Sequence, residues 1–202
     1  MTAKTVVAGI AFLAAAFAAT SALAQKPQTE RLRGVIETVD GHTLTAKSDN
    51  GAKLKLNLAD KVTVVEVVEA SMADIKDGSF IGSGAMPQPD GTQKAVEVHI
   101  FPESMRGTGE GFRPWTRPGS TMTNGTVGAI VTGVHGPVIT VKYKGGEQKI
   151  VVPPGVPIVK YEIGDMSAVK PGAAFSVFAA VKRPDGSFDV ARINIDRTGG
   201  VH

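Results

Sequence analysis

The chain contains one sequence pattern twice. Ile75-Lys76-Asp77-Gly78 returns as Val169-Lys170-Pro171-Gly172, and Pro89-Asp90-Gly91 returns as Pro184-Asp185-Gly186, 94 and 95 residues later. Three further matches lie at the same shifts: Thr45-Ala46-Lys47 with Thr140-Val141-Lys142, Met72 with Met166, and Val96-Glu97-Val98 with Ala191-Arg192-Ile193. Motifs that return in order at a near-constant shift indicate duplicated structural units. The sequence therefore predicts two homologous units, spanning about 31–101 and 124–198.

Each unit shows the two-residue alternation of half-buried β-strands. Leu54, Leu56 and Leu58 alternate with polar residues, and turn pairs such as Asp40-Gly41 and Asn50-Gly51 separate the strand-like runs. Such alternation gives a strand one buried and one wet face, and Asp-Gly or Asn-Gly pairs suit tight hairpins. We expect an all-β protein of two tandem small antiparallel OB-like barrels. A pair of small β-sandwiches is the alternative.

The chain begins with a segment that precedes both predicted units. Residues 1–24 combine Lys4, an apolar run and an Ala-Leu-Ala ending, which is the layout of a cleaved signal peptide. A membrane anchor is the alternative, but the run is shorter than the roughly 20 residues that span a bilayer. We expect a periplasmic or secreted protein with no membrane span after cleavage. Its parts are a first barrel at 25–101, a Gly/Pro-rich linker at 102–123 and a second barrel at 124–202.

Composition excludes several functional classes. The absence of Cys removes disulfides, thiol catalysis and cysteine zinc sites. A net charge of +3 is too small to indicate a nucleic-acid partner, and no G-x-S-x-G nucleophile motif is present. We expect a non-catalytic protein without a cofactor.

The predicted linker holds residues that a spacer does not need. It contains Trp115, the only tryptophan, with Phe112 and three arginines, Arg106, Arg113 and Arg117. In one interpretation the aromatic rings pin the linker to a barrel and the arginines are solvated. In the other the segment is a recognition loop, since Trp and Arg are enriched at binding hot spots. The second interpretation makes the protein a binding or adaptor protein, whose partner is another envelope protein or an oligosaccharide.

A metal-handling function is the alternative. Glu97 and His99 share a strand face, and Glu103 follows shortly after. Carboxylate and imidazole groups are common metal ligands. The other interpretation of these residues is an ordinary solvated strand face.

The middle of the chain resembles a known family. Three segments resemble the two-unit members of a family of exported bacterial small β-barrel domains of unknown function. They are the stretch from His99 to Gly111, Arg113-Pro114-Trp115, and Pro118 to Met122. The Asp-Ile-Lys-Asp-Gly turn that ends at Gly78 also fits. The resemblance spans nearly all of the expected mature chain, and it implies an exported, OB-like protein without an established activity. Relatives are sometimes labelled metal-transporter permeases, which need several membrane-spanning helices.

Overall fold

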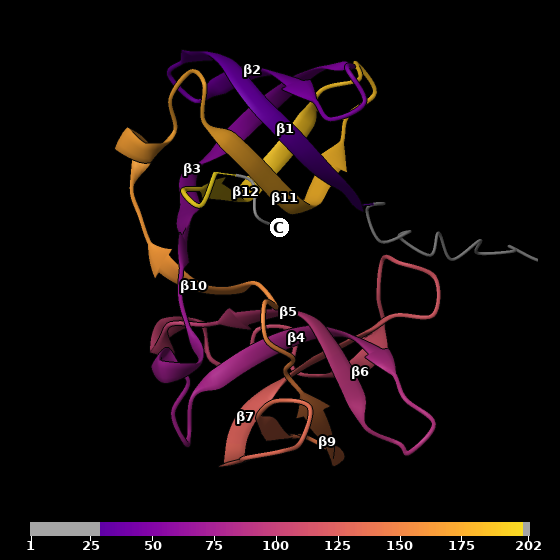
Figure 1. Cartoon of the computed structure of the whole chain (residues 1–202). Helices are drawn as coiled ribbons and strands as arrows, with labels where there is room; N and C mark the ends of the chain where they lie inside the picture. The colour runs from indigo at the N-terminus through magenta and orange to yellow at the C-terminus, as the bar shows by residue number, and fades with distance from the viewer. Residues whose placement is uncertain (1–28, 200–202) are drawn as a thin grey trace, which may run out of the picture.

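The computed structural model describes residues 29–199 and confirms an all-β fold (Figure 1). The predicted signal peptide, residues 1–24, lies outside the described residues. The strands are β1 (Thr29–Asp40), β2 (Thr43–Ser48), β3 (Lys53–Glu69), β4 (Phe80–Pro87), β5 (Gln93–Ile100), β6 (Gly111–Pro114), β7 (Thr121–Val131), β8 (Val138–Tyr143), β9 (Gly146–Val151), β10 (Ile158–Ile163), β11 (Ala174–Lys182) and β12 (Phe188–Asp196). Three single-turn 3₁₀ helices are η1 (Met72–Asp74), η2 (Glu103–Met105) and η3 (Met166–Ala168). In the part of the chain that the structure describes, no helix has the length and apolar character that crossing a bilayer requires.

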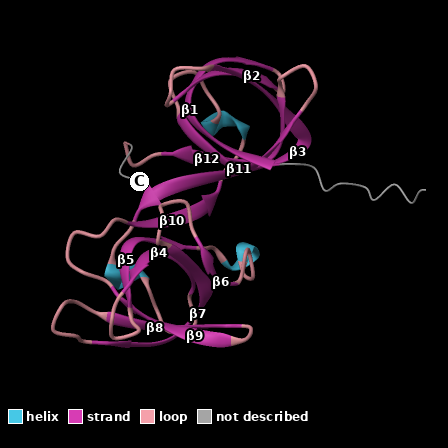
Figure 2. Cartoon of the chain, turned by 90° about the vertical axis from the view of Figure 1, so that its right-hand side faces the viewer, coloured by secondary structure: helices cyan, strands magenta, loops and turns pink. Residues whose placement is uncertain are grey.

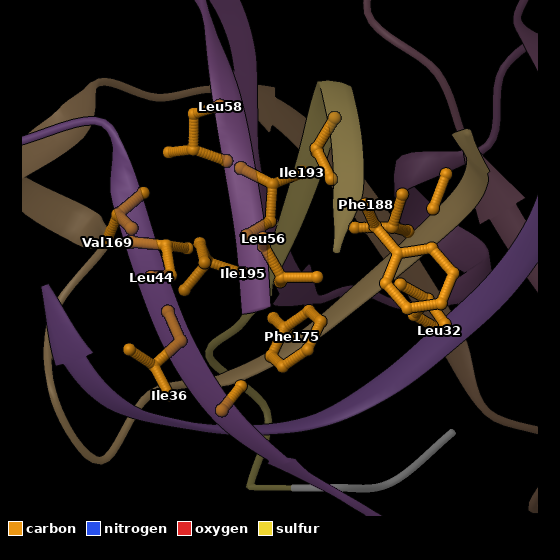
Figure 3. Close-up of a cluster of buried hydrophobic side chains, with 14 of the residues drawn as sticks. Leu32, Ile36, Leu44, Leu56, Leu58, Val169, Phe175, Phe188, Ile193 and Ile195 are labelled. Carbon is orange, nitrogen blue, oxygen red and sulfur yellow. The ribbon is translucent and has the colours of Figure 1, made fainter. Parts of the chain in front are cut away.

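Five strands close the first barrel, in the order β1-β2-β3-β12-β11. All of these pairs are antiparallel except β3 with β12, which is parallel. Figure 2 shows these strands encircling a common axis. Inside lies one apolar cluster, which includes Leu56, Phe175 and Phe188 (Figure 3). Closure leaves none of its five strands as a bare edge.

Five of the remaining strands form a second ring around another apolar cluster. Its order is β5-β4-β7-β8-β9, and parallel pairing of Gln93 and Lys94 in β5 with Ile150 and Val151 in β9 completes the circuit. The ring and the barrel each contain a glycine at which two strands approach closely. A Cβ on Gly34 in β1 would lie 2.1 Å from the carbonyl oxygen of Lys47, and one on Gly125 in β7 would lie 2.3 Å from that of Lys142. Only glycine allows this close strand approach.

The strand pairing divides the chain differently from the predicted boundaries. Strands β1 to β3 come from 25–101, but β11 and β12, which close their barrel, come from 124–202. Strands β4 and β5 join β7 to β9 in the second ring in the reciprocal way. The two units have therefore exchanged their last two strands. The predicted linker 102–123 is also structured in part, because it holds η2 and β6, and β6 pairs with β7.

The long strand β3 connects the first barrel to the second ring. It stays extended for 17 residues, so it leaves the first barrel and carries the following strands towards the second ring (Figure 1). Its last third pairs antiparallel with β10, and Val67 lies opposite Tyr161. These two residues are counterparts at the 94-residue shift. The exchange is therefore organised about a pseudo-twofold axis that passes close to the Val67–Tyr161 pair.

Candidate functional site

Two adjoining cavities lie where the barrel meets the ring, and both are lined by His99, Trp115, Tyr161 and Phe178. One has a volume of about 250 Å³ and contains the carboxylates of Asp49, Glu97 and Asp196 in its wall; we call it the acidic cavity. The other has a volume of about 300 Å³ and is lined by Arg31, Arg113 and Arg192; we call it the arginine cavity.

The exchange of strands builds this site. Strand β5 brings Glu97 and His99 to one side of the axis, pairing in parallel with β10. Strand β12 brings Arg192 and Asn194, their counterparts at the 95-residue shift, to the other side, pairing in parallel with β3. Equivalent positions of the two units thus carry an acidic residue, Glu97, and a basic residue, Arg192, on opposite sides of the site.

The side chains of Glu97, His99 and Tyr161 form a continuous chain of contacts. Glu97 Oε2 lies 3.6 Å from His99 Nε2, and His99 Nδ1 lies 3.1 Å from the Tyr161 hydroxyl oxygen. A Cβ at Gly84 would come within 2.8 Å of Glu97 Oε1, so glycine leaves room for this carboxylate. His99 is only 8% exposed. The interpretation of this strand face as solvated is therefore wrong, because the β3–β10 pair packs against it.

Burial and neighbouring charges set the protonation of these groups. Burial alone would raise the pKa of Glu97, but hydrogen bonding and charge at His99, together with Arg33 and the Trp115 side chain, outweigh it and lower the pKa below the ordinary value. Burial raises the pKa of the Tyr161 hydroxyl, and the nearby Glu97 carboxylate adds to the effect. Glu97 is therefore ionised and Tyr161 neutral at pH 7.

Cations and aromatic rings meet in the arginine cavity. The Arg31 guanidinium carbon lies 3.9 Å from the centre of the Trp115 ring, and that of Arg113 lies 5.7 Å from it. The Arg192 guanidinium lies 5.9 Å from the Tyr161 ring. Cation–π contacts at these distances hold a guanidinium in place. The indole of Trp115 thus positions two of the three cations.

The structure separates the five binding residues that the sequence indicated. Arg113 and Trp115 line the arginine cavity. Phe112 and Arg117 are exposed. Arg106 forms an ion pair with Glu103, 2.6 Å from Nη2 to Oε2, and also donates to the Gly78 carbonyl oxygen at 3.0 Å, so it ties η2 to the start of β4.

The three residues of the metal alternative do not come together. Glu97 and His99 are neighbours, whereas Glu103 is occupied by Arg106. Among residues 29–199, no group of three or more His, Cys, Asp or Glu side chains could hold a metal ion.

Several residues of the site escaped the sequence analysis. Arg31, Tyr161, Phe178 and Arg192 all line the arginine cavity, and each sits within an ordinary strand pattern. The only available signal was the repeat itself, which makes Arg192 and Asn194 the counterparts of Glu97 and His99. That signal becomes useful only when β5 and β12 are known to face one hollow.

Replacing Glu97 with glutamine should make the stability of the fold less dependent on acid. Because the pKa of Glu97 is lowered by folding, its ionised form stabilises the protein above the ordinary carboxyl value of about 4.3. This contribution disappears as the pH falls through the lowered pKa. We expect Glu97→Gln to be less stable than the wild type at pH 7, and the difference to shrink in acid. Urea unfolding measures it.

The exposed Glu147→Gln variant is the matched control for this pH series. Its free energy of unfolding should follow the wild type across the whole pH range. A Glu97→Gln deficit that stayed constant from pH 7 into acid would show that the ionised carboxylate does not contribute as described.

Comparison with known proteins assigns no family. No family model, no curated protein and no solved structure matched the chain. The resemblance noted in the sequence therefore stays a prediction, and the function must be argued from the cavities.

Proposed function

We propose that the protein is a non-catalytic binding protein of the bacterial envelope, which holds a small molecule between the barrel and the ring. One observation carries the proposal: Arg113 and Trp115, the unusual residues of the 102–123 segment, line the arginine cavity instead of facing outward. A volume of about 300 Å³ lies at the lower end of the range for small-molecule pockets. The end of an oligosaccharide is one ligand of this size.

The buried pair of His99 and Tyr161 supports a binding function over a catalytic one. These residues are 8% and 4% exposed, and they contact each other. A general acid or base must reach within hydrogen-bond distance of the substrate. His99 and Tyr161 line both cavities, but they are paired with each other, and this pairing suits side chains that fix the cavity wall.

The envelope location follows from the predicted signal peptide. Residues 1–24 have a charged start, an apolar run and a small-residue cleavage pattern. Stability without disulfides, which a chain without Cys needs after export, is supplied by the closed barrel and its apolar cluster.

An adaptor function is the second candidate, favoured by the outer face of the same segment. Phe112 is 42% exposed, and Arg117, five residues later, is exposed as well. An exposed aromatic ring with a nearby arginine suits contact with another envelope protein.

Small molecules that remain bound through purification should identify the function. The full chain is exported from a bacterial host, purified without denaturant and then unfolded, and the released compounds are identified by mass spectrometry. Ala191 lines the arginine cavity and is exposed, so Ala191→Phe should fill the cavity without disturbing the core. We expect a compound that the wild type releases and Ala191→Phe does not.

The matched control is Ala129→Phe, at an exposed alanine of β7 outside the cavities. It should release the same compound as the wild type. If the wild type and Ala191→Phe release the same compounds, the cavity is not the binding site. If an envelope protein is then captured by the wild type but not by Phe112→Ser, the adaptor function replaces the proposal.

A further inference from the structure

The wall of the arginine cavity carries three cations, whereas Glu97, whose charge acts on Arg31, lines the adjoining acidic cavity. Arg31, Arg113 and Arg192 line the arginine cavity, and no Asp or Glu among the described residues does so. None of the ion pairs found within residues 29–199 includes any of the three. Like charges in one hollow repel each other, so this arrangement is costly unless an anion joins it.

Among residues 29–199, most of the guanidinium donors in the cavity have no hydrogen-bond partner. Arg113 Nη1 donates to the Gly109 carbonyl oxygen at 2.6 Å, and Arg192 Nε donates to Asn194 Oδ1 at 3.3 Å. Each guanidinium carries five N–H donors in a planar fork. Two parallel N–H groups of such a fork match the oxygens of a carboxylate or phosphate.

Partial burial has already weakened the hydration of these cations. Burial lowers the pKa of Arg31, of Arg113 and of Arg192. At Arg31 the neighbouring charges of Arg113 and Arg33 lower the pKa further, and the Glu97 carboxylate only partly opposes them. A cation that has lost water gains more from an oxyanion than a fully hydrated one. The cavity is thus prepared for negative charge.

Apolar and aromatic side chains share the cavity wall with the polar residues Thr108, Asn124 and Asn194. Phe101, Met122 and Phe178 line it together with the Trp115 ring. Arg31 lies 3.9 Å from the centre of the Trp115 ring and 5.7 Å from that of Phe178. Phe101, Met122 and Phe178 therefore offer the more open apolar surface to the body of a ligand. Binding pockets commonly combine such apolar walls with a few polar groups that fix orientation.

We propose that the arginine cavity binds a small organic anion, whose oxyanion group contacts Arg113 and Arg192 and whose apolar body lies against Phe101 and Phe178. This inference rests on the proposed function and names its ligand class. Carboxylates and phosphate esters share the required chemistry, and the experiment below separates them.

Calorimetric titration of the full chain with matched naphthalene probes tests the charge requirement. The probes are 2-naphthoate, 1-naphthyl phosphate, the neutral 2-naphthalenemethanol and inorganic phosphate. At least one naphthyl anion should bind about tenfold or more tightly than the neutral alcohol, as expected when charge-assisted hydrogen bonds are lost. The naphthyl anion that binds more tightly identifies the oxyanion type, and inorganic phosphate alone should bind weakly because it lacks the apolar body.

Arg192→Gln should weaken binding of that anion about tenfold or more, and the exposed Arg117→Gln should leave it unchanged, while both variants keep the wild-type melting curve. If the alcohol binds as tightly as the anions and Ala191→Phe abolishes that binding, the anion inference fails and the cavity remains a binding site. If no probe shows binding that Ala191→Phe removes, the inference fails, and the compounds released on unfolding then decide the proposed function separately.

Discussion

A disulfide is expected to form when Thr29→Cys and Val181→Cys are combined in one chain. These residues lie opposite each other across β1 and β11, which belong to different halves of the sequence. Directly paired residues of antiparallel strands have Cα atoms about 4.5–5.5 Å apart, which a disulfide can bridge. Because the chain contains no Cys, the double variant offers a single intramolecular pairing. Thiol titration and a non-reducing gel measure it.

The matched control combines Thr29→Cys with Met86→Cys. Met86 is the counterpart of Val181, since it pairs with Lys94 in β4–β5 as Val181 pairs with Asp189 in β11–β12. If residues 25–101 closed on themselves, this second pair would form the disulfide instead. Free thiols in the Val181 variant and a disulfide in the Met86 variant would overturn the exchanged pairing and restore the boundaries expected from the sequence.

The side chains at three equivalent positions explain why the strands are exchanged. In the first barrel these positions hold Leu32, Val177 and Phe188, all buried in one apolar cluster. Leu32 pairs with Val177 across β1 and β11, and Phe188 pairs with Leu56 across β12 and β3. These three positions of the barrel are therefore filled by hydrocarbon.

The second ring carries polar groups at the same three positions. Thr123 pairs with Ser83, and Gln93 pairs with Ile150, as their counterparts do in the barrel. The Ser83 hydroxyl donates to a backbone carbonyl at 3.1 Å, and Gln93 Oε1 accepts from the Thr121 hydroxyl at 2.8 Å. If β4 and β5 closed the first barrel, Ser83 would keep its bond to the Glu97 carbonyl of β5. Gln93 would enter the hydrocarbon cluster without Thr121, at a cost of about 1–3 kcal/mol.

Local patterns in the sequence predict the strands but not which strands pair with one another. The alternation of Leu54, Leu56 and Leu58 predicts a strand, and the structure confirms one. The repeat predicts two similar units, and the structure has one closed five-strand barrel beside the second ring. Because homologous strands offer the same backbone hydrogen bonds, however, the repeat cannot say which copy pairs with which. That choice depends on distant side chains such as Phe188 and Gln93.

The same limit applies to the candidate site. Arg113 and Trp115 could be named from the sequence because such residues are unusual in a Gly/Pro-rich segment. Arg31, Tyr161 and Arg192 sit in strands, where alternation accounts for each of them separately. These residues come together only because β3 pairs with β10, while β12 pairs with β3 and β5 pairs with β10.

The polarity difference between barrel and ring predicts a large loss of stability for Phe188→Gln. Gln93 is the residue of the second ring at the position equivalent to Phe188. The change gives the first barrel the same residue type, beside Leu32 (Figure 3). Removing a buried phenyl ring costs about 3–5 kcal/mol, and an amide without a partner adds to the loss. We expect about 4 kcal/mol or more, a large part of the roughly 5–15 kcal/mol that stabilises a typical domain. Urea unfolding measures it.

The exposed Phe112 provides the control, because Phe112→Gln makes the same chemical change where the ring is 42% exposed. Its free energy of unfolding should change by about 0.5 kcal/mol, as for most surface substitutions. If Phe188→Gln cost no more than Phe112→Gln, the first barrel would tolerate the polar residue that β5 would bring to it. The polarity of the side chains could then not explain why β11 and β12 close the first barrel in place of β4 and β5. The length of β3 would be the remaining explanation.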